Sequence, residues 1–165
     1  MRVLQTLNDN VSWRKLVGPK SKRLKDMEMI LRFFAFLYDS AGYAAPMKNF
    51  LNRYMAKNRS LTKQSEKDLS DIFSLSTQTI LSGIGERAFR PKRSVNAAVV
   101  DSLMTGIAKR LLVHKPFTDI KSLKARYDSL ITDTAYLDAS ETGTSQPANI
   151  TARFTRAEQA FSQMQ

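Results

Sequence analysis

The densest apolar run in the chain lies between Met27 and Tyr38, where only Glu28 and Arg32 are charged. These two residues are four positions apart, so on a helix they share one face and can form an ion pair. The other sides of such a helix are apolar, which is typical of a helix surrounded by neighbours. The pattern therefore predicts a central helix at about residues 24–39, around which the rest of the chain packs.

Apolar residues recur at intervals of three and four positions in five further segments, and this period is typical of amphipathic helices. Further helices are expected after Pro46, over residues 65–82, after caps at Ser94 and Thr118, and over residues 150–164. No strand pair with a hairpin turn is visible in the pattern. The predicted fold class is therefore all-α, a single irregular bundle of about six helices.

A chain of 165 residues with a hydrophobic content of 42% is predicted to form one helical domain over residues 1–165. Residues 1–19 carry apolar side chains with few neighbours before them, and we expect a remnant of a larger protein or a docking segment. They are compatible with two short helices separated near residues 8–10. Residues 138–149, DASETGTSQPAN, are predicted to form a polar loop before the last helix.

The net charge of +11 is unevenly distributed: residues 1–59 carry +8, residues 60–116 carry +4 and residues 117–165 carry −1. Such asymmetry favours a basic face that contacts phosphate or an acidic protein, although a charged surface also serves solubility. Phosphate contacts position a nucleic acid without reading its sequence. The candidate DNA-binding or phosphate-binding residues are Lys20, Lys22, Arg23, Lys25, Arg90, Lys92 and Arg93.

Catalytic residue types are scarce. The chain has no cysteine and one histidine, His114, which excludes a thiolate nucleophile and a zinc–thiolate site. The glycines at 83 and 85 lack the Gly-Lys-Ser/Thr of a phosphate-binding loop and follow a helix rather than a strand. We therefore expect a chain that is not an enzyme, with no cofactor and no metal.

The longest apolar run, about twelve residues, is shorter than the roughly 20 residues of a membrane span. The first residues also lack the apolar core and cleavage site of a signal peptide. A cytoplasmic protein without a membrane partner is expected.

Arg32 and Asp101 each lie between apolar neighbours, and either would be costly to bury without a partner. With Glu28, they are predicted to be buried, structural polar residues. Arg32 is expected to pair with Glu28 or another acid and to fix the register of the helices. The alternative is a polar pocket inside the bundle.

Five sequence blocks occur in this order: LNDNVSWRKLVG, KRLKDMEMILRFFAFLY, MKNFLNRYM, IGERAFR and NAAVVDSLMTGIAKRL. Together they resemble the helical C-terminal part of the GmrSD-like family (domain of unknown function 262), over about residues 7–112. In that family the helical part follows an N-terminal ParB-like domain with an Asp-Gly-Gln-Gln-Arg motif. Members are implicated in the restriction of modified phage DNA, and some cleave DNA in a nucleotide-dependent manner. The motif and that domain are absent from this sequence.

The resemblance implies a non-catalytic helical module of a phage-defence, restriction-type protein. Such a module would assemble with a ParB-like nuclease domain, or as a homo-oligomer, and would present a basic face to DNA. The alternative is a protein-interaction module or a truncated gene product without a role in DNA binding.

Overall fold

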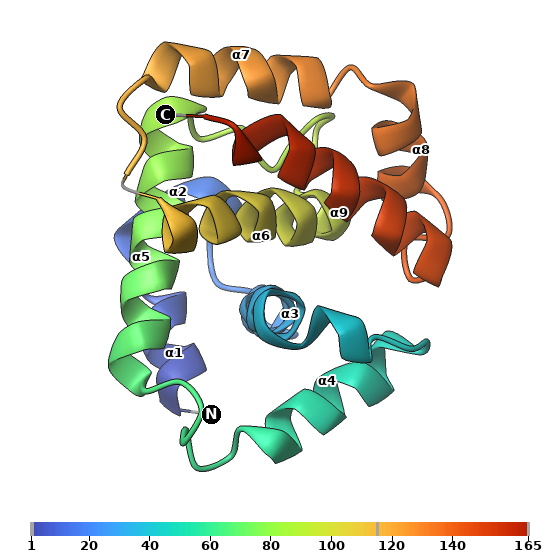
Figure 1. Ribbon diagram of the computed structural model, residues 1–165. Coiled ribbons are helices and arrows are strands. Elements are labelled where there is room, and N and C mark those ends of the chain that lie inside the picture. The colour runs from blue at the N-terminus through green and yellow to red at the C-terminus, as the bar shows by residue number, and fades with distance from the viewer. Residues whose placement is uncertain (1, 115, 165) are drawn as a thin grey trace.

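Helix α3 (Lys25–Asp39) runs through the middle of the fold, and other helices surround it on several sides (Figure 1). Ile30, Phe33 and Phe36 on this helix have no exposed surface, in agreement with the apolar run. The structure, a computed structural model, describes residues 2–114 and 116–164. Within these residues every regular element is a helix, which confirms the all-α class.

The described residues form nine α-helices and one short 3₁₀ helix, more than the six or so expected from periodicity. Three helices of seven or eight residues account for the difference. Two of them, Arg2–Asn8 and Val11–Val17, agree with the two short helices considered for residues 1–19. The third, Thr134–Glu141, was not expected, because two turns offer too few apolar positions for a periodic pattern. None of the described helices is long and apolar enough to cross a membrane. Besides α3, the elements are α1 (Arg2–Asn8), α2 (Val11–Val17), η1 (Ser40–Gly42), α4 (Met47–Lys57), α5 (Glu66–Gly83), α6 (Ala97–Val113), α7 (Ile120–Leu130), α8 (Thr134–Glu141) and α9 (Pro147–Ser162).

Helix α6 is a second central helix, because it packs on α3, α5 and α9 together. Every residue from Ala98 to Ala108 is buried. Small side chains allow the neighbouring backbones to come close: a Cβ atom on Gly106 would lie only 3.1 Å from the carbonyl oxygen of Ala157 on α9. Figure 1 shows α6 and α9 next to each other above α3.

Helices α1 and α2 belong to the same hydrophobic core as the rest of the chain. Trp13 and Leu16 have no exposed surface, and the Trp13 ring meets Phe73 and Phe89 edge-on, at centroid distances of 5.5 and 6.0 Å. Trp13 and Leu16, from a segment with few apolar neighbours before it in the sequence, are therefore packed within the fold. Their partners come from much later in the sequence, so neighbouring positions could not reveal them.

The predicted polar loop over residues 138–149 is wrong for most of its length. Helix α8 continues to Glu141, and α9 begins at Pro147. Asp133 caps α8 by accepting a hydrogen bond of 2.7 Å from a backbone N–H in its first turn, and proline favours the first turn of a helix. The composition is polar because α8 is short and half of it faces solvent.

Two of the predicted N-cap residues are wrong by one or two positions. Helix α6 is capped by Asn96 instead of Ser94, since Asn96 Oδ1 accepts the backbone N–H of Ala98 at 2.9 Å. Helix α7 is capped by Asp119 instead of Thr118. Asparagine and aspartate are at least as good N-caps as serine and threonine, so these neighbours compete closely.

We predict that Gly106→Leu lowers the free energy of unfolding by about 2 kcal/mol, because the added side chain overpacks the α6–α9 contact. Urea unfolding followed by the fluorescence of Trp13, the single tryptophan, measures this change. The control is Ala125→Leu on the exposed face of α7, where leucine adds bulk without overpacking. Equal stability of both variants would contradict the close approach of α6 and α9.

Candidate functional site

The first basic loop, residues 18–24 between α2 and α3, is held by the carboxylate of Asp26 in the first turn of α3. Asp26 Oδ2 accepts hydrogen bonds from the Ser21 backbone N–H (3.1 Å) and from Nδ2 of Asn8 (3.0 Å). It also accepts one from Nη1 of Arg14 (3.0 Å). Burial raises the pKa of Asp26, but these hydrogen bonds outweigh burial and hold the pKa below its ordinary value.

The basic side chains at this loop, Lys20, Lys22, Arg23 and Lys25, are all exposed. Lys20 forms an ion pair with Asp9. Within the described residues, no acidic side chain pairs with Lys22, Arg23 or Lys25. Three of the four predicted phosphate contacts in this region therefore present positive charge to solvent without a neighbouring acid.

The second basic loop, residues 84–96 between α5 and α6, meets the first loop through Arg90. Nη1 of Arg90 donates to the backbone oxygens of Leu16 (2.5 Å) and Glu86 (2.9 Å). A Cβ atom on Gly18 would lie 3.6 Å from Nη2 of the same guanidinium. Nη1 of Arg90 thus ties the second basic loop to the last turn of α2, directly before the first basic loop.

Lys92 and Arg93, the other two predicted phosphate contacts of the second basic loop, differ in whether an acidic side chain balances their charge. Lys92 Nζ lies 2.7 Å from a carboxylate oxygen of Glu141 at the end of α8, so its charge is balanced. Arg93 is exposed, and no acid among the described residues pairs with it. We call the set without acidic partners the basic surface; its members are Lys22, Arg23, Lys25 and Arg93.

The predicted structural residues Arg32 and Asp101 form a direct ion pair between α3 and α6. Nε of Arg32 lies 3.1 Å from Oδ1 of Asp101, and Nη2 lies 2.5 Å from Oδ2. Burial lowers the pKa of Arg32, but the Asp101 carboxylate outweighs burial and raises it. Glu28 is not buried, as its side chain is 55% exposed, and it lies 3.7 Å from Nη1 of Arg32. Asp101, which is fully buried, is therefore the main partner.

Arg153 on α9 is the third member of this cluster, and sequence reasoning missed it. It is fully buried, and its Nη2 lies 3.6 Å from Oδ2 of Asp101. Nη1 donates to the backbone oxygen of Thr144 at 2.7 Å, whereas Nε and Nη2 have no hydrogen-bond partner. Burial lowers the pKa of Arg153. Arg153 lies three positions after Ile150, which places it on the apolar face of the helix. This spacing is the sequence feature from which its burial could have been predicted.

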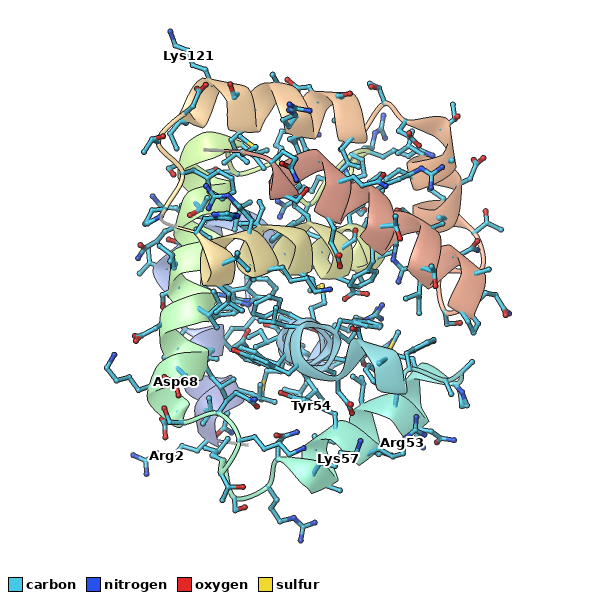
Figure 2. All side chains as sticks on the ribbon, viewed as in Figure 1. Arg2, Arg53, Tyr54, Lys57, Asp68 and Lys121 are labelled. Atoms are coloured by element: carbon cyan, nitrogen blue, oxygen red, sulfur yellow. The ribbon has the colours of Figure 1, made fainter. Side chains whose placement is uncertain are left out.

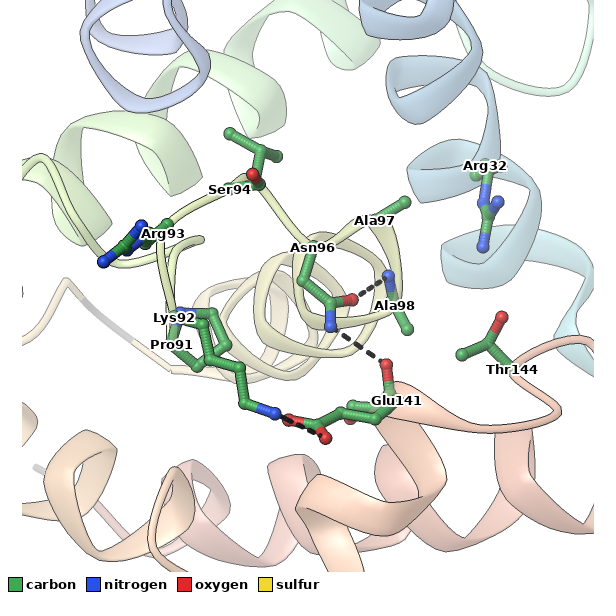
Figure 3. A pocket seen from close by; sticks show the side chains of 12 residues that line it. Arg32, Pro91, Lys92, Arg93, Ser94, Asn96, Ala97, Ala98, Glu141 and Thr144 are labelled. Atoms are coloured by element: carbon green, nitrogen blue, oxygen red, sulfur yellow. Dashed lines mark hydrogen bonds and ion pairs between the residues drawn. The ribbon is translucent and has the colours of Figure 1, made fainter.

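An open pocket of about 780 Å³ lies beside the cluster (Figure 3). Arg32 borders one end, the residues Pro91–Asn96 border the other, and the first turn of α6 lies between them. Asn96 Nδ2 donates to the backbone oxygen of Ser140 at 2.9 Å. This bond and the Lys92–Glu141 ion pair attach the second basic loop, which forms one wall of the pocket, to the end of α8.

A second pocket, about 770 Å³, is largely apolar and lies among α1, α3, α4 and the start of α5. Its lining includes Leu4, Phe34 and Met55, and Met55 is exposed. The N-terminal helix thus contributes one wall of an apolar groove.

Neither pocket contains a recognisable catalytic set. His114 is the exposed C-cap residue of α6, in the position expected for a histidine at a helix end. Among the residues that the structure describes, no group of three or more His, Cys, Asp or Glu could hold a metal ion.

Comparisons of the chain with protein-family models, with curated proteins and with solved structures found no match. The resemblance to the GmrSD-like family therefore stays a prediction from the sequence blocks.

We predict that Asp101→Ala lowers the free energy of unfolding by about 3–5 kcal/mol, because it leaves buried Arg153 and half-buried Arg32 without their shared carboxylate. Chemical unfolding at pH 7 measures the change. Asp138→Ala, at an exposed position of α8, is the control and should remain within about 0.5 kcal/mol of wild type. A loss at Asp101 no larger than at Asp138 would contradict the cluster.

We predict that Asp26→Asn flattens the dependence of stability on pH below about pH 4. The folded-state pKa of Asp26 lies below the ordinary value of 3.8, so the carboxylate stabilises the fold above that pH. This contribution is lost as the pH falls through the folded-state pKa. Free energies of unfolding measured from pH 7 to pH 2 test this prediction. Asp138→Asn should give a curve parallel to wild type.

Proposed function

We propose that this chain is a non-catalytic helical module of a GmrSD-like, restriction-type protein, and that its basic surface holds the phosphate backbone of DNA. The observation that carries the proposal is that Lys22, Arg23, Lys25 and Arg93 are exposed and have no acidic partner among the described residues. The first three lie in the first basic loop and at the start of α3; Arg93 lies in the second basic loop, which Arg90 ties to the last turn of α2. The sequence resemblance supports DNA as the polymer and a ParB-like nuclease domain as the partner.

Two features of the described residues favour phosphate contact over base recognition. The exposed cations lie on loops and on the first residue of α3, rather than along one helix face that could enter a groove. Cations of this kind release the counterions of DNA, which gives sequence-independent binding with dissociation constants of about 10⁻⁴–10⁻⁶ M at physiological salt. Such contacts position DNA for a partner that does the chemistry.

The experiment compares two triple variants that lose the same charge. Lys22→Gln, Arg23→Gln and Lys25→Gln remove most of the basic surface. Lys48→Gln, Lys63→Gln and Lys121→Gln remove three exposed lysines elsewhere. Lys121, for example, projects outward from the first turn of α7 (Figure 2).

We predict that the first triple variant binds a duplex more weakly and reduces the slope of log affinity against log salt by about 2–3, since each lost phosphate contact removes about 0.9. The second triple variant should keep most of the wild-type slope. Fluorescence anisotropy with a labelled duplex, from 50 to 300 mM salt, measures both quantities.

Equal losses in the two triple variants would mean that only net charge matters, and the basic surface would not be a site. Absence of wild-type binding at 50 mM salt would exclude the DNA role. That result would favour the protein-interaction alternative, for which the apolar groove beside Leu4 and Met55 offers a surface.

A further inference from the structure

One end of the pocket in Figure 3 brings a guanidinium and a hydroxyl toward the same space. Arg32 extends from α3, and Thr144 extends toward it from the segment between α8 and α9. Ala97 and Ala98, in the first turn of α6, line the pocket to one side of them. This end is some distance from Arg93, which points away from it at the opposite end of the pocket.

Arg32 keeps donor capacity for a further acceptor. Its Nε and Nη2 atoms donate to the Asp101 carboxylate. Its Nη1 atom lies 3.7 Å from Glu28, beyond hydrogen-bond distance, and Glu28 is exposed to solvent. Because a guanidinium has five N–H donors in a rigid fork, one edge can hold Asp101 while another binds an oxyanion.

The charges beside the pocket are balanced in number but incompletely hydrogen-bonded. Arg32 and Arg153 both face the carboxylate of Asp101, and Glu28 lies 3.7 Å from Nη1 of Arg32. Arg153 is fully buried, two of its nitrogens have no hydrogen-bond partner, and the third donates to the backbone of Thr144, a residue of the pocket wall. Buried donors and charges without partners are costly. An anion at the pocket side of Arg32 would add an acceptor to a network in which several donors have none.

The start of α6 adds a weaker attraction. Asn96 Oδ1 already accepts the backbone N–H groups of Ala98 and Val99, so the helix end is capped. The partial positive charge of the helix dipole nevertheless favours an anion within the first turn.

We propose that this pocket binds a small phosphorylated molecule, with its phosphate group between Arg32 and Thr144. Arginine is the residue best suited to bind a phosphate group, because its planar fork can donate to two phosphate oxygens at once. Pro91, Val95 and Ala97 offer apolar surface to the organic part. The volume of about 780 Å³ lies in the usual range for small-molecule sites.

Ala97→Asp is the decisive variant, because Ala97 lines the pocket and is the first residue of α6. Aspartate in the first turn of a helix is favourable for folding, yet its negative charge would oppose a phosphate. Ala97→Asn is the matched control, with nearly the same shape and no charge. Thr144→Val removes the hydroxyl but keeps the backbone oxygen that Arg153 requires.

Inorganic phosphate and glycerol 3-phosphate, with glycerol as the uncharged control, are titrated at constant ionic strength into the full chain. The amide NMR signals of Ala97, Ala98 and Thr144 report binding at this site. We expect both phosphates, but not glycerol, to shift these signals. Ala97→Asp should weaken binding at least tenfold, Thr144→Val several-fold, and Ala97→Asn less than threefold.

Unchanged wild-type signals, or equal affinity of wild type and Ala97→Asp, would overturn the proposal. The affinity of the same variants for a DNA duplex distinguishes a small-molecule site from a site for the DNA backbone. If Ala97→Asp leaves the affinity for the duplex unchanged, the site is distinct from the basic surface and the small-molecule assignment stands. If duplex affinity falls in parallel with phosphate affinity, the pocket takes backbone phosphate and the small-molecule assignment is wrong.

Discussion

The fully buried carboxylate of Asp101 is the interaction on which the arrangement of the helices depends. It lies between Arg32 and Arg153, so it joins α3, α6 and α9, three helices that are far apart in the sequence. Each charge would be costly to bury alone, and the cost is offset only when all three helices meet in one register. Apolar packing would tolerate several such registers, whereas the ion cluster favours one.

Close packing around α6 makes this cluster possible. Gly106 lets the backbone of α9 approach, and the buried stretch from Ala98 to Ala108 allows α3, α5 and α9 to share one helix. Trp13 holds α2 against Phe73 of α5 and Phe89 of the second basic loop. The N-terminal segment is thereby fixed next to the second basic loop.

The positive charges of the chain divide into two groups with different consequences. Some arginines, such as Arg90 and Arg153, donate to backbone oxygens and hold loops in place. Others, such as Arg23, face solvent and pair with no acid among the residues that the structure describes. Net charge alone cannot separate the two groups, because the difference lies in which acceptors the fold brings near. The loops anchored by Arg90 in turn position both the basic surface and the wall of the pocket.

The sequence by itself determined the helical class, the central helix and the need of Arg32 for an acidic partner, because periodicity and the cost of burying charge are local properties. It missed α8, since two turns carry little periodic signal. Glu28 was predicted to be buried because it is the acid one helical turn from Arg32 in the sequence. In the structure Glu28 is exposed, and the buried partner of Arg32 is Asp101 from another helix. Only the tertiary structure decided that Arg153 joins this pair beside a pocket, because contacts between distant helices depend on how they pack and not on spacing along the chain.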